Sequence, residues 1–380
     1  MAITALQVLE RTLRVTWDDG GAEEFHHLWL RDHGVAAGDL HADTRERVVD
    51  FHALQPDLRP LEAELEGEET IRVVWSDRRE TRHDGGWLRA HTYAPGRGTG
   101  LGSAREPWRA EMVEHLPFFD YREVVESEAI QLRFLRGLVR DGFSLLTGAP
   151  SAEGEVERLA GHLGYLREIC FGRLRDIRVE PSAYNIAFTD DVVKPHTDLA
   201  NYAWPPGVQF LHCLVQEASG GETRLVDGLA AANDLRAEDR EAFDALTRVE
   251  VEFQISNRDY DVRAASPILV AGPEGEFKMI RFSNQARRSF VCHPDLVEPF
   301  YRGYRRLSEL LNDAGNQVHF RLAPGQILAM DNHRVLHARD AFNASSGRRH
   351  LQIGSMEMDV VMSRIRLLER KLNDRDTRTA

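Results

Sequence analysis

Cysteine is scarce in this sequence, and long apolar runs are missing. Only three cysteines occur in 380 residues, Cys170, Cys213 and Cys292, and no two of them are close together. They form neither a Cys-x-x-Cys pair nor an even-numbered disulfide framework, so a thiolate zinc site is excluded and a reducing compartment is favoured. No segment approaches the roughly 20 apolar residues of a membrane span, and the first 20 residues lack the order of a signal peptide. We therefore expect a cytoplasmic protein without a membrane segment.

Positive charge is also in short supply. The chain has 48 Lys and Arg against 61 Asp and Glu, a formal net charge of −13. A surface with this imbalance repels polyanions, so neither nucleic acid nor an anionic membrane is an expected partner, although a local basic pocket is compatible with it. With 42% hydrophobic and 29% charged residues, the composition is that of a folded globular protein.

The chain is long enough for two domains, and its pattern changes once. Residues 1–93 predict a small β-rich domain, because "LRVTW" and "IRVVW" alternate like strands. Residues 94–108, "APGRGTGLGSAREPW", are rich in Gly and poor in large apolar side chains, which is typical of a linker. Residues 109–380 then form the larger predicted domain.

The larger domain is predicted to be mainly β with helical insertions. A helix is expected over 127–142, with Ile130, Phe134, Leu135 and Leu138 on one face and Gly142 as its stop. From residue 184 onward, short strands follow one another, beginning with "YNIAFT". Many short strands with few long insertions favour a double-stranded β-helix, or jelly roll. Further helices are expected over 153–164, 227–246, 294–315 and 363–380.

A His-x-Asp triplet lies in the middle of the chain, in "VVKPHTDLANYAWPPGVQFLH". If the segment is a strand, His196 and Asp198 point to the same face and could share one metal ion. An isolated triplet of this kind is more often a hydrogen-bonded pair, so it needs support from elsewhere.

Support comes from two later segments. In "PGQILAMDNHRVLHARDAF", an apolar strand leads through Asp331 and Asn332 to His337. Two histidines and one carboxylate are the set that leaves three positions open on ferrous iron, which is what dioxygen and a co-substrate require. Arg349 follows twelve residues later and could bind the far carboxylate of a metal-chelating dicarboxylate.

Together these segments resemble one enzyme family. The sequence is similar to the iron(II)- and 2-oxoglutarate-dependent dioxygenases of the γ-butyrobetaine hydroxylase branch, within the taurine dioxygenase superfamily. The matching segments are "HTD", "PPGVQFLHC", "GGETRLVDG", "DNHRVLHAR" and "RRHLQ", in family order over residues 140–365, with "FHHLWLRDH" and "GWL" in the front domain.

The resemblance implies roles for individual residues. Iron would be held by His196, Asp198 and His337, and 2-oxoglutarate by Arg349 with Thr223. Arg339 is a weaker cofactor candidate that we expect to be structural. The implied reaction converts 2-oxoglutarate and dioxygen to succinate and carbon dioxide while an aliphatic carbon is hydroxylated. Relatives are commonly homodimers, so we expect a homodimer here.

The front domain departs from many relatives, which bind zinc there through a cysteine cluster and a later histidine. Here "WLRD" is followed by "HGVAAGDLHADT" without a cysteine, and the later position falls on Arg79. His33, His41 and His83 could form a replacement site, but histidines at such spacing are more often surface residues. We do not expect zinc.

The residues at the expected substrate pocket also differ from those of the family. In the family, an aromatic cage holds a trimethylammonium group by cation–π attraction. The cage positions fall here on Phe171, Arg175, Phe188 and Ser355, so two rings remain. Tyr184 and Tyr202 could replace the missing rings. Trp204 could as well, although we expect it in the core.

Polar residues near these positions suggest the acidic end of a zwitterion. Asn185 matches a substrate-contacting position, and Asn201 lies where small apolar residues are usual. Asn284, Arg287 and Arg288 fall in the segment that approaches the acidic end, unless the two arginines are solvated. A doubly charged oxyanion would suit these donors. The first prediction is therefore 2-(trimethylamino)ethylphosphonate, and the alternative is γ-butyrobetaine or trimethyllysine.

Three other functions compete with hydroxylation. A catalytically inert binding protein would explain the fold but not why every iron and 2-oxoglutarate position carries the right residue type. A zinc or manganese hydrolase would need an extra acid–base pair that the sequence does not offer. A halogenase of this family would have a small residue at position 198, where this chain has Asp198.

Overall fold

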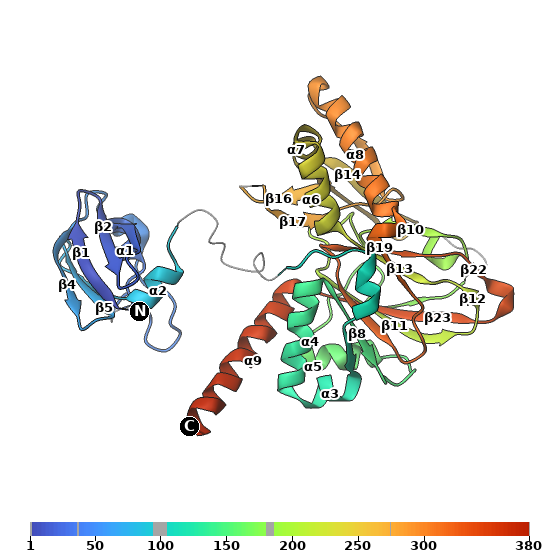
Figure 1. Ribbon diagram of the computed structural model, residues 1–380, viewed down its shortest axis with the longest axis horizontal. Coiled ribbons are helices and arrows are strands. Elements are labelled where there is room, and N and C mark those ends of the chain that lie inside the picture. The colour runs from blue at the N-terminus through green and yellow to red at the C-terminus, as the bar shows by residue number, and fades with distance from the viewer. Residues whose placement is uncertain (1, 36–37, 94–104, 180–185, 274, 380) are drawn as a thin grey trace. The chain divides into compact units, whose positions relative to one another are not determined.

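The computed structural model describes residues 2–35, 38–93, 105–179, 186–273 and 275–379. The chain divides into two compact units, residues 1–100 and residues 101–380 (Figure 1). Most of the predicted linker lies outside the described residues, and the exact domain bounds stay a prediction. Trp108, which we had placed in the linker, belongs to the second unit, because its backbone N–H donates to Asp227 at 3.1 Å and its side chain is buried.

The first unit consists of two three-stranded antiparallel sheets, each followed by a short helix. Alternate residues of the second and fifth strands are fully buried, among them Val15, Trp17, Val73 and Trp75, and together they form its core. The elements are β1 (Ile3–Val8), β2 (Thr12–Trp17), β3 (Ala22–His26), α1 (His27–Asp32), β4 (Pro60–Glu66), β5 (Thr70–Trp75), β6 (Glu80–Asp84) and α2 (Gly85–Ala90).

The second unit contains the two sheets of a jelly roll, so the predicted fold of the larger domain is confirmed. The six-stranded sheet has the order β7-β8-β20-β11-β23-β9, and the four-stranded sheet has the order β10-β21-β13-β19. The first consists of β7 (Phe118–Asp120), β8 (Phe143–Thr147), β20 (Ile327–Asp331), β11 (Val208–Gln216), β23 (Arg349–Met356) and β9 (Leu174–Ile177). The second consists of β10 (Val193–His196), β21 (Val335–Arg339), β13 (Thr223–Asp227) and β19 (Gln317–Phe320).

The six-stranded sheet is buried on both faces. Leu328 and Met330 of β20 pack with Leu225 and Val335 of the smaller sheet, so one core lies between the sheets. Ile327 and Ala329 point the other way, into a second core under the helices. This is why β20 is continuously apolar instead of alternating.

Helices α3 (Tyr121–Glu126), α4 (Glu128–Asp141), α5 (Glu155–Leu163) and α9 (Met358–Thr379) cover that outer face (Figure 1). The prediction for α4 is confirmed: the Ser127 side chain caps its first turn, and Gly142 ends it with φ 80°, the left-handed conformation that favours glycine.

Three helices and several short strands form an insertion with its own core. The single helix predicted over 227–246 is wrong, because Asp239 interrupts it and caps a second helix. "YNIAFT" does not begin a strand either, since Ile186–Phe188 form a 3-10 turn. The elements are α6 (Gly228–Glu238), α7 (Arg240–Arg248), α8 (Val297–Asn312), β14 (Val251–Ser256), β15 (Asp261–Ser266), β16 (Leu269–Ala271), β17 (Phe277–Ile280) and β18 (Arg287–Phe290). Outside this insertion, β12 (Ser219–Gly220) pairs with β22 (Phe342–Asn343).

None of the helices in the described ranges has both the length and the apolar character that a membrane span requires.

Candidate active site

Two histidines from neighbouring strands form the centre of the site. His196 ends β10, and His337 lies directly opposite it in the antiparallel register of β10 and β21. Directly opposed residues of an antiparallel pair project from the same face of the sheet. Their ring centroids are 4.3 Å apart, so the sheet itself brings the two imidazoles together.

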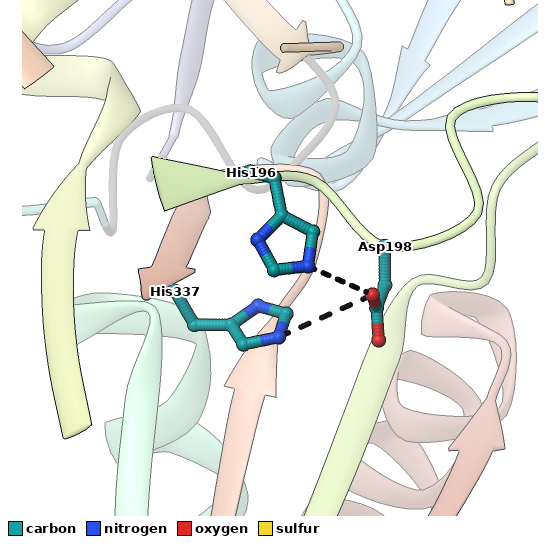
Figure 2. A group of neighbouring side chains, drawn as sticks. All are labelled: His196, Asp198 and His337. Atoms are coloured by element: carbon teal, nitrogen blue, oxygen red, sulfur yellow. Dashed lines mark ion pairs between the residues drawn. The ribbon is translucent and has the colours of Figure 1, made fainter. Parts of the chain in front are cut away.

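Asp198 joins them by a different route from the one we predicted. Because β10 ends at His196, strand alternation does not place this carboxylate. A turn does: the Thr197 N–H donates to the Phe282 carbonyl at 2.7 Å, and Leu199 takes a left-handed conformation with φ 56°. Oδ1 of Asp198 thereby lies 3.2 Å from His196 Nε2 and 4.0 Å from His337 Nε2 (Figure 2).

This group fits a divalent metal ion. His196 Nδ1 lies 2.9 Å from the Lys194 carbonyl, and in the neutral imidazole it must be the donor to that acceptor. The lone pair of Nε2 then faces the Asp198 carboxylate, which is unfavourable unless a cation lies between them. The three donor atoms lie within 4.8 Å of one another, and a modest contraction would give the roughly 3 Å separation of adjacent ligands bonded at about 2.1 Å.

The protonation states also suit metal binding. Burial lowers the pKa of His337 to about 3, so its ring is neutral near pH 7. Burial by itself would raise the pKa of Asp198, but the neighbouring rings of His337 and His196 and the guanidinium of Arg175 hold it well below its ordinary value. The site therefore presents neutral imidazole and ionised carboxylate, the forms that bind metal.

A second His-carboxylate group, Glu153, Asp176 and His350, lies on the other face of β9 and β23. There His350 Nε2 lies 2.9 Å from Asp176 Oδ1, and the Gln352 amide donates to the same oxygen. Asp176 is thus satisfied by His350 and Gln352, and none of the three residues lines the pocket described below.

Asn332 holds Asp198 in place. This fully buried amide accepts from the Asp198 N–H at 2.9 Å and donates to the carbonyls of Asp198 and Pro206, each at 3.0 Å. Asn332 therefore binds both the backbone N–H and the backbone carbonyl of Asp198, which makes it a positioning residue. Asn332 stands in the segment "DNHRVLHAR", whose sequence alone indicates no role for it.

Replacing Asn332 with alanine should therefore weaken metal binding. Loss of such a supporting contact typically costs about 10- to 100-fold in metal affinity, and we expect a fall of that size in a Co(II) titration followed by absorbance. Asn312→Ala, at an exposed site on α8, is the matched control. Unchanged Co(II) affinity in Asn332→Ala would show that the turn holds Asp198 without it.

The three residues open into a cavity of about 310 Å³ between the two sheets. Four arginines line it, whereas Asp198 is its single carboxylate among the described residues. Apart from the imidazoles, no described lining residue is aromatic. The lining includes Arg175, Ile177, Ile186, Thr223, Gln254, Ser256, Gln285, Arg288, Arg339, Arg349, Leu351 and Ile353.

Arg349 and Thr223, the residues predicted to bind 2-oxoglutarate, both line this cavity, and both are buried. No hydrogen bond or ion pair connects the Arg349 guanidinium to another described residue, and its buried Nε has no partner. Burial lowers its pKa to about 10, so the group stays charged near neutral pH. Gly221, whose φ of 74° favours glycine, lies beside this group: a Cβ at that position would be only 3.3 Å from Arg349 Nε. A buried cation with free donors requires an anion.

Arg339 differs from Arg349 because both of its terminal nitrogens are occupied, although its Nε, like that of Arg349, has no partner among the described residues. Its terminal nitrogens donate to the carbonyls of Ala187, Thr189 and Asp191 at 2.7 to 3.0 Å. Although Arg339 lines the cavity, its hydrogen bonds hold the segment before β10 in place. These contacts are consistent with the structural role that we expect for it.

The predicted aromatic positions do not form a cage in the described part of the chain. Phe188 is buried in the core between the sheets, because the 3-10 turn directs it inward, and does not line the cavity. Phe171 packs edge-on against Tyr260, with ring centroids 5.3 Å apart, and beneath Arg175. Tyr184 and Asn185 lie outside the described residues.

Neither Asn201 nor Tyr202 lines the cavity. Asn201 is fully buried, and its amide donates to the Val262 carbonyl at 3.2 Å. The Tyr202 hydroxyl accepts from the Cys170 N–H at 2.7 Å, which ties the loop after Asp198 to the segment before β9. The expectation that Trp204 packs in the core is wrong, since its side chain is 56% exposed.

Of the residues predicted to approach the acidic end, only Arg288 reaches the cavity. It is exposed, and it donates to the Gln254 side chain and to two carbonyls. Arg287 stacks over Tyr304, whose hydroxyl donates to Asn284 at 2.6 Å. Both of those contacts lie outside the cavity lining.

Our prediction missed Gln254, Ser256 and Gln285, which add neutral polar groups to the cavity wall. They come from β14 and from the turn before β18. No sequence motif contains them, and their place in the wall depends on how the insertion packs against the jelly roll.

In the front domain, His83 is buried rather than open to a metal. Its Nε2 lies 2.9 Å from the Thr81 hydroxyl, and its side chain packs in the core of that unit. Burial lowers its pKa from about 6.5 to about 4, with a smaller contribution from His33.

This buried histidine should make the front domain acid-sensitive. Above pH 6.5 its stabilising effect is complete; as the pH falls toward 4, the unfolded chain takes up a proton that the folded chain refuses, with a loss of roughly 3 kcal/mol. Hydrogen exchange of the β5 and β6 amides should therefore report a lower opening free energy at pH 5 than at pH 7. His83→Leu should flatten this dependence, and the exposed His52→Leu should not. An equal pH dependence in all three proteins would contradict the assignment.

The geometry of the His196, Asp198 and His337 group agrees with the protein families that the sequence matches. Residues 102–353, more than half of the chain, match the model of the family described as taurine catabolism dioxygenase TauD, TfdA family. The chain belongs to this family. Residues 4–89 match the γ-butyrobetaine hydroxylase-like N-terminal family. The resemblance that the motifs suggested is thus confirmed at both ends of the chain.

Named relatives cover nearly the whole chain. The γ-butyrobetaine dioxygenase of Pseudomonas sp. (strain AK-1) is 34% identical over 358 residues, 94% of this chain and 93% of that protein. The human γ-butyrobetaine dioxygenase is 26% identical over 95% of each chain. The mitochondrial trimethyllysine dioxygenase of Rattus norvegicus is 30% identical over 90% of this chain and 82% of that protein.

The family membership confirms the class of enzyme. The protein is a non-haem iron dioxygenase that uses Fe(II), with 2-oxoglutarate and dioxygen as co-substrates, as the sequence analysis predicted. The inert binding protein and the zinc or manganese hydrolase are therefore set aside. The homodimer stays a prediction.

Proposed function

We propose that this enzyme hydroxylates an aliphatic carbon of a small quaternary-ammonium acid of the γ-butyrobetaine or trimethyllysine type. The observation that carries this proposal is the 34% identity, across 94% of the chain, to a γ-butyrobetaine dioxygenase. The cavity supports it, since about 310 Å³ suits a small co-substrate and a small substrate.

The residue roles belong to the same proposal. His196, Asp198 and His337 hold iron through Nε2, Oδ1 and Nε2, the atoms that already face one another. Arg349 binds the far carboxylate of 2-oxoglutarate, and Thr223, on the same wall, adds a hydroxyl. Bound Fe(II) would supply the redox chemistry by which one oxygen atom of O2 enters succinate and the other enters the substrate as hydroxyl.

The chain's own contribution is to arrange these partners and to keep water away. Leu211, Leu351 and Ile353 line the cavity with apolar surface from the six-stranded sheet. The Lys194 carbonyl, 2.9 Å from His196 Nδ1, orients this ring so that Nε2 faces Asp198, and Asn332 fixes the turn of Asp198. Apolar walls also strengthen the charge interactions between the arginines and the carboxylates that they bind.

The named relatives favour the carboxylate substrates, which we ranked second, over 2-(trimethylamino)ethylphosphonate, which we ranked first. The structure offers the phosphonate little of what was predicted, because Asn201 and Arg287 do not line the cavity and Arg288 is exposed. The carboxylate betaines are therefore the proposed substrates.

A coupled turnover screen tests the proposal. The Fe(II) enzyme is incubated with 2-oxoglutarate and ascorbate, and oxygen consumption and succinate are measured with γ-butyrobetaine, trimethyllysine, 2-(trimethylamino)ethylphosphonate and taurine. Hydroxylation of γ-butyrobetaine or trimethyllysine, identified by mass spectrometry, would support the proposal. Stoichiometric turnover of only the phosphonate or only taurine would overturn it.

A further inference from the structure

We propose that Arg175 binds the acidic end of the primary substrate, directly beside the iron ligands. This inference rests on the proposed function and deepens it, because it names the group that orients the substrate. Among the residues singled out from the sequence, Arg175 was noted only as a missing aromatic ring.

Arg175 reaches the cavity from the edge of the six-stranded sheet. It lies on β9 opposite Ile353 of β23, and both residues line the cavity together with Ile177. Its neighbour Asp176 points to the other face, toward His350. Strand alternation along β9 therefore directs the Arg175 side chain into the cavity.

The guanidinium is held in place but not satisfied. It lies over the Phe171 ring, 4.8 Å from the centroid, and Phe171 is itself packed against Tyr260. Its side chain is 14% exposed, and its buried Nε has no hydrogen-bond partner. No described residue accepts a hydrogen bond from it. A preorganised, desolvated cation with free donors is what an anion-binding group requires.

The one acid that Arg175 faces in the described chain is Asp198, and that contact is incomplete. Nη2 of Arg175 lies 3.6 Å from Asp198 Oδ2, beyond hydrogen-bonding distance, and this buried oxygen also lacks a partner. Oδ1, in contrast, faces both imidazoles. When a divalent ion takes up the charge of Asp198, Arg175 loses most of its counter-charge and needs another anion.

The other cavity arginines are less suited to this task. The terminal nitrogens of Arg339 donate to three carbonyls, and Arg349 is assigned to 2-oxoglutarate. Arg288 is exposed and shares its donors with Gln254 and two carbonyls. An acid bound at Arg175 would lie beside the metal group.

The test compares an acid with its amide, because only the acid can form an ion pair. The protein is loaded with Mn(II) and 2-oxoglutarate, which gives no turnover, and is titrated with γ-butyrobetaine and with its carboxamide by calorimetry. Wild type should prefer the acid. Arg175→Gln should weaken acid binding at least roughly 30-fold, the cost of truncating one partner of a buried charge pair, and change amide binding less than about threefold.

Two further variants serve as controls. Arg173→Gln removes an exposed arginine of the same segment and should behave as wild type. Arg175→Lys keeps the charge and should restore part of the preference for the acid. Electron paramagnetic resonance of Mn(II) establishes that each variant still binds metal.

The outcomes separate the two proposals. If Arg175→Gln weakens the acid and the amide equally, Arg175 acts on Asp198 and the inference is wrong. The inference also fails if Arg288→Gln, rather than Arg175→Gln, abolishes the preference for the acid. If wild type binds neither γ-butyrobetaine nor trimethyllysine, the proposed function itself is overturned, and this inference with it.

Discussion

Replacing Asp198 with alanine is expected to abolish succinate formation coupled to substrate hydroxylation. The change removes the carboxylate that faces both imidazoles, and it leaves His196 and His337 alone to hold the metal. Two neutral ligands cannot match the charge or the three-point geometry that a facial ferrous site requires. Turnover should fall below detection in a succinate assay at saturating 2-oxoglutarate, and Co(II) binding should weaken in parallel.

A control variant separates loss of the ligand from loss of fold. Asp191→Ala removes an exposed carboxylate of the segment before β10 and should keep wild-type turnover. Both variants should retain the circular dichroism of the parent, because no buried apolar contact changes. Wild-type coupled turnover in Asp198→Ala would refute the ligand assignment.

The same variant tests for hidden halogenase chemistry. In such enzymes a small residue at this position leaves room for a halide. Asp198→Ala, assayed with bromide, should give neither hydroxylated nor brominated product if the site is built for hydroxylation alone. Brominated product would mean that the surrounding pocket already accepts a halide.

The iron set could be predicted from sequence because each ligand carries a local signal. His196 and Asp198 stand in one triplet, and His337 follows an apolar strand that had to be buried. The register of β10 with β21 then brings the two histidines opposite each other. Asp198 lies beside the two histidines because of a turn, and not because of the strand alternation that we predicted.

The substrate wall could not be predicted in the same way. Whether a ring lines a pocket depends on the path of its backbone, and the 3-10 turn of Ile186–Phe188 sends Phe188 into the core. Tyr202 does not line the pocket, because its hydroxyl accepts a hydrogen bond from the Cys170 N–H, 32 residues away in the sequence. Periodicity says nothing about such pairings.

Arg175 marks the limit of the sequence argument. When the sequence is compared with the family, Arg175 stands where an aromatic ring is expected. The structure shows instead that its guanidinium lies 3.6 Å from Asp198, a candidate iron ligand. That distance follows from the pairing of β9 with β23 and from the turn after β10, which no single segment encodes.

Replacing Arg349 with alanine is the second large effect that we expect. The variant should raise the Kd of 2-oxoglutarate at least roughly 30-fold, because the far carboxylate would lose a buried charge-assisted partner. Since the pKa of Arg349 is lowered only to about 10, the wild-type group is charged throughout the assay range, and the effect should be constant from pH 6.5 to 8. Thermal shift with Mn(II) and 2-oxoglutarate measures it without turnover.

The neighbouring residue is the matched control. Arg348 lies one position earlier, is 79% exposed and pairs with Glu217 outside the cavity, so Arg348→Ala should bind 2-oxoglutarate normally. A 2-oxo acid that lacks the far carboxylate, such as 2-oxobutyrate, completes the cycle. Wild type should reject it strongly, and Arg349→Ala should discriminate little, because the discriminating contact is gone. If Arg349→Ala keeps both its affinity and its discrimination, the far carboxylate binds elsewhere, and Arg339, the next buried cation on that wall, becomes the residue to test.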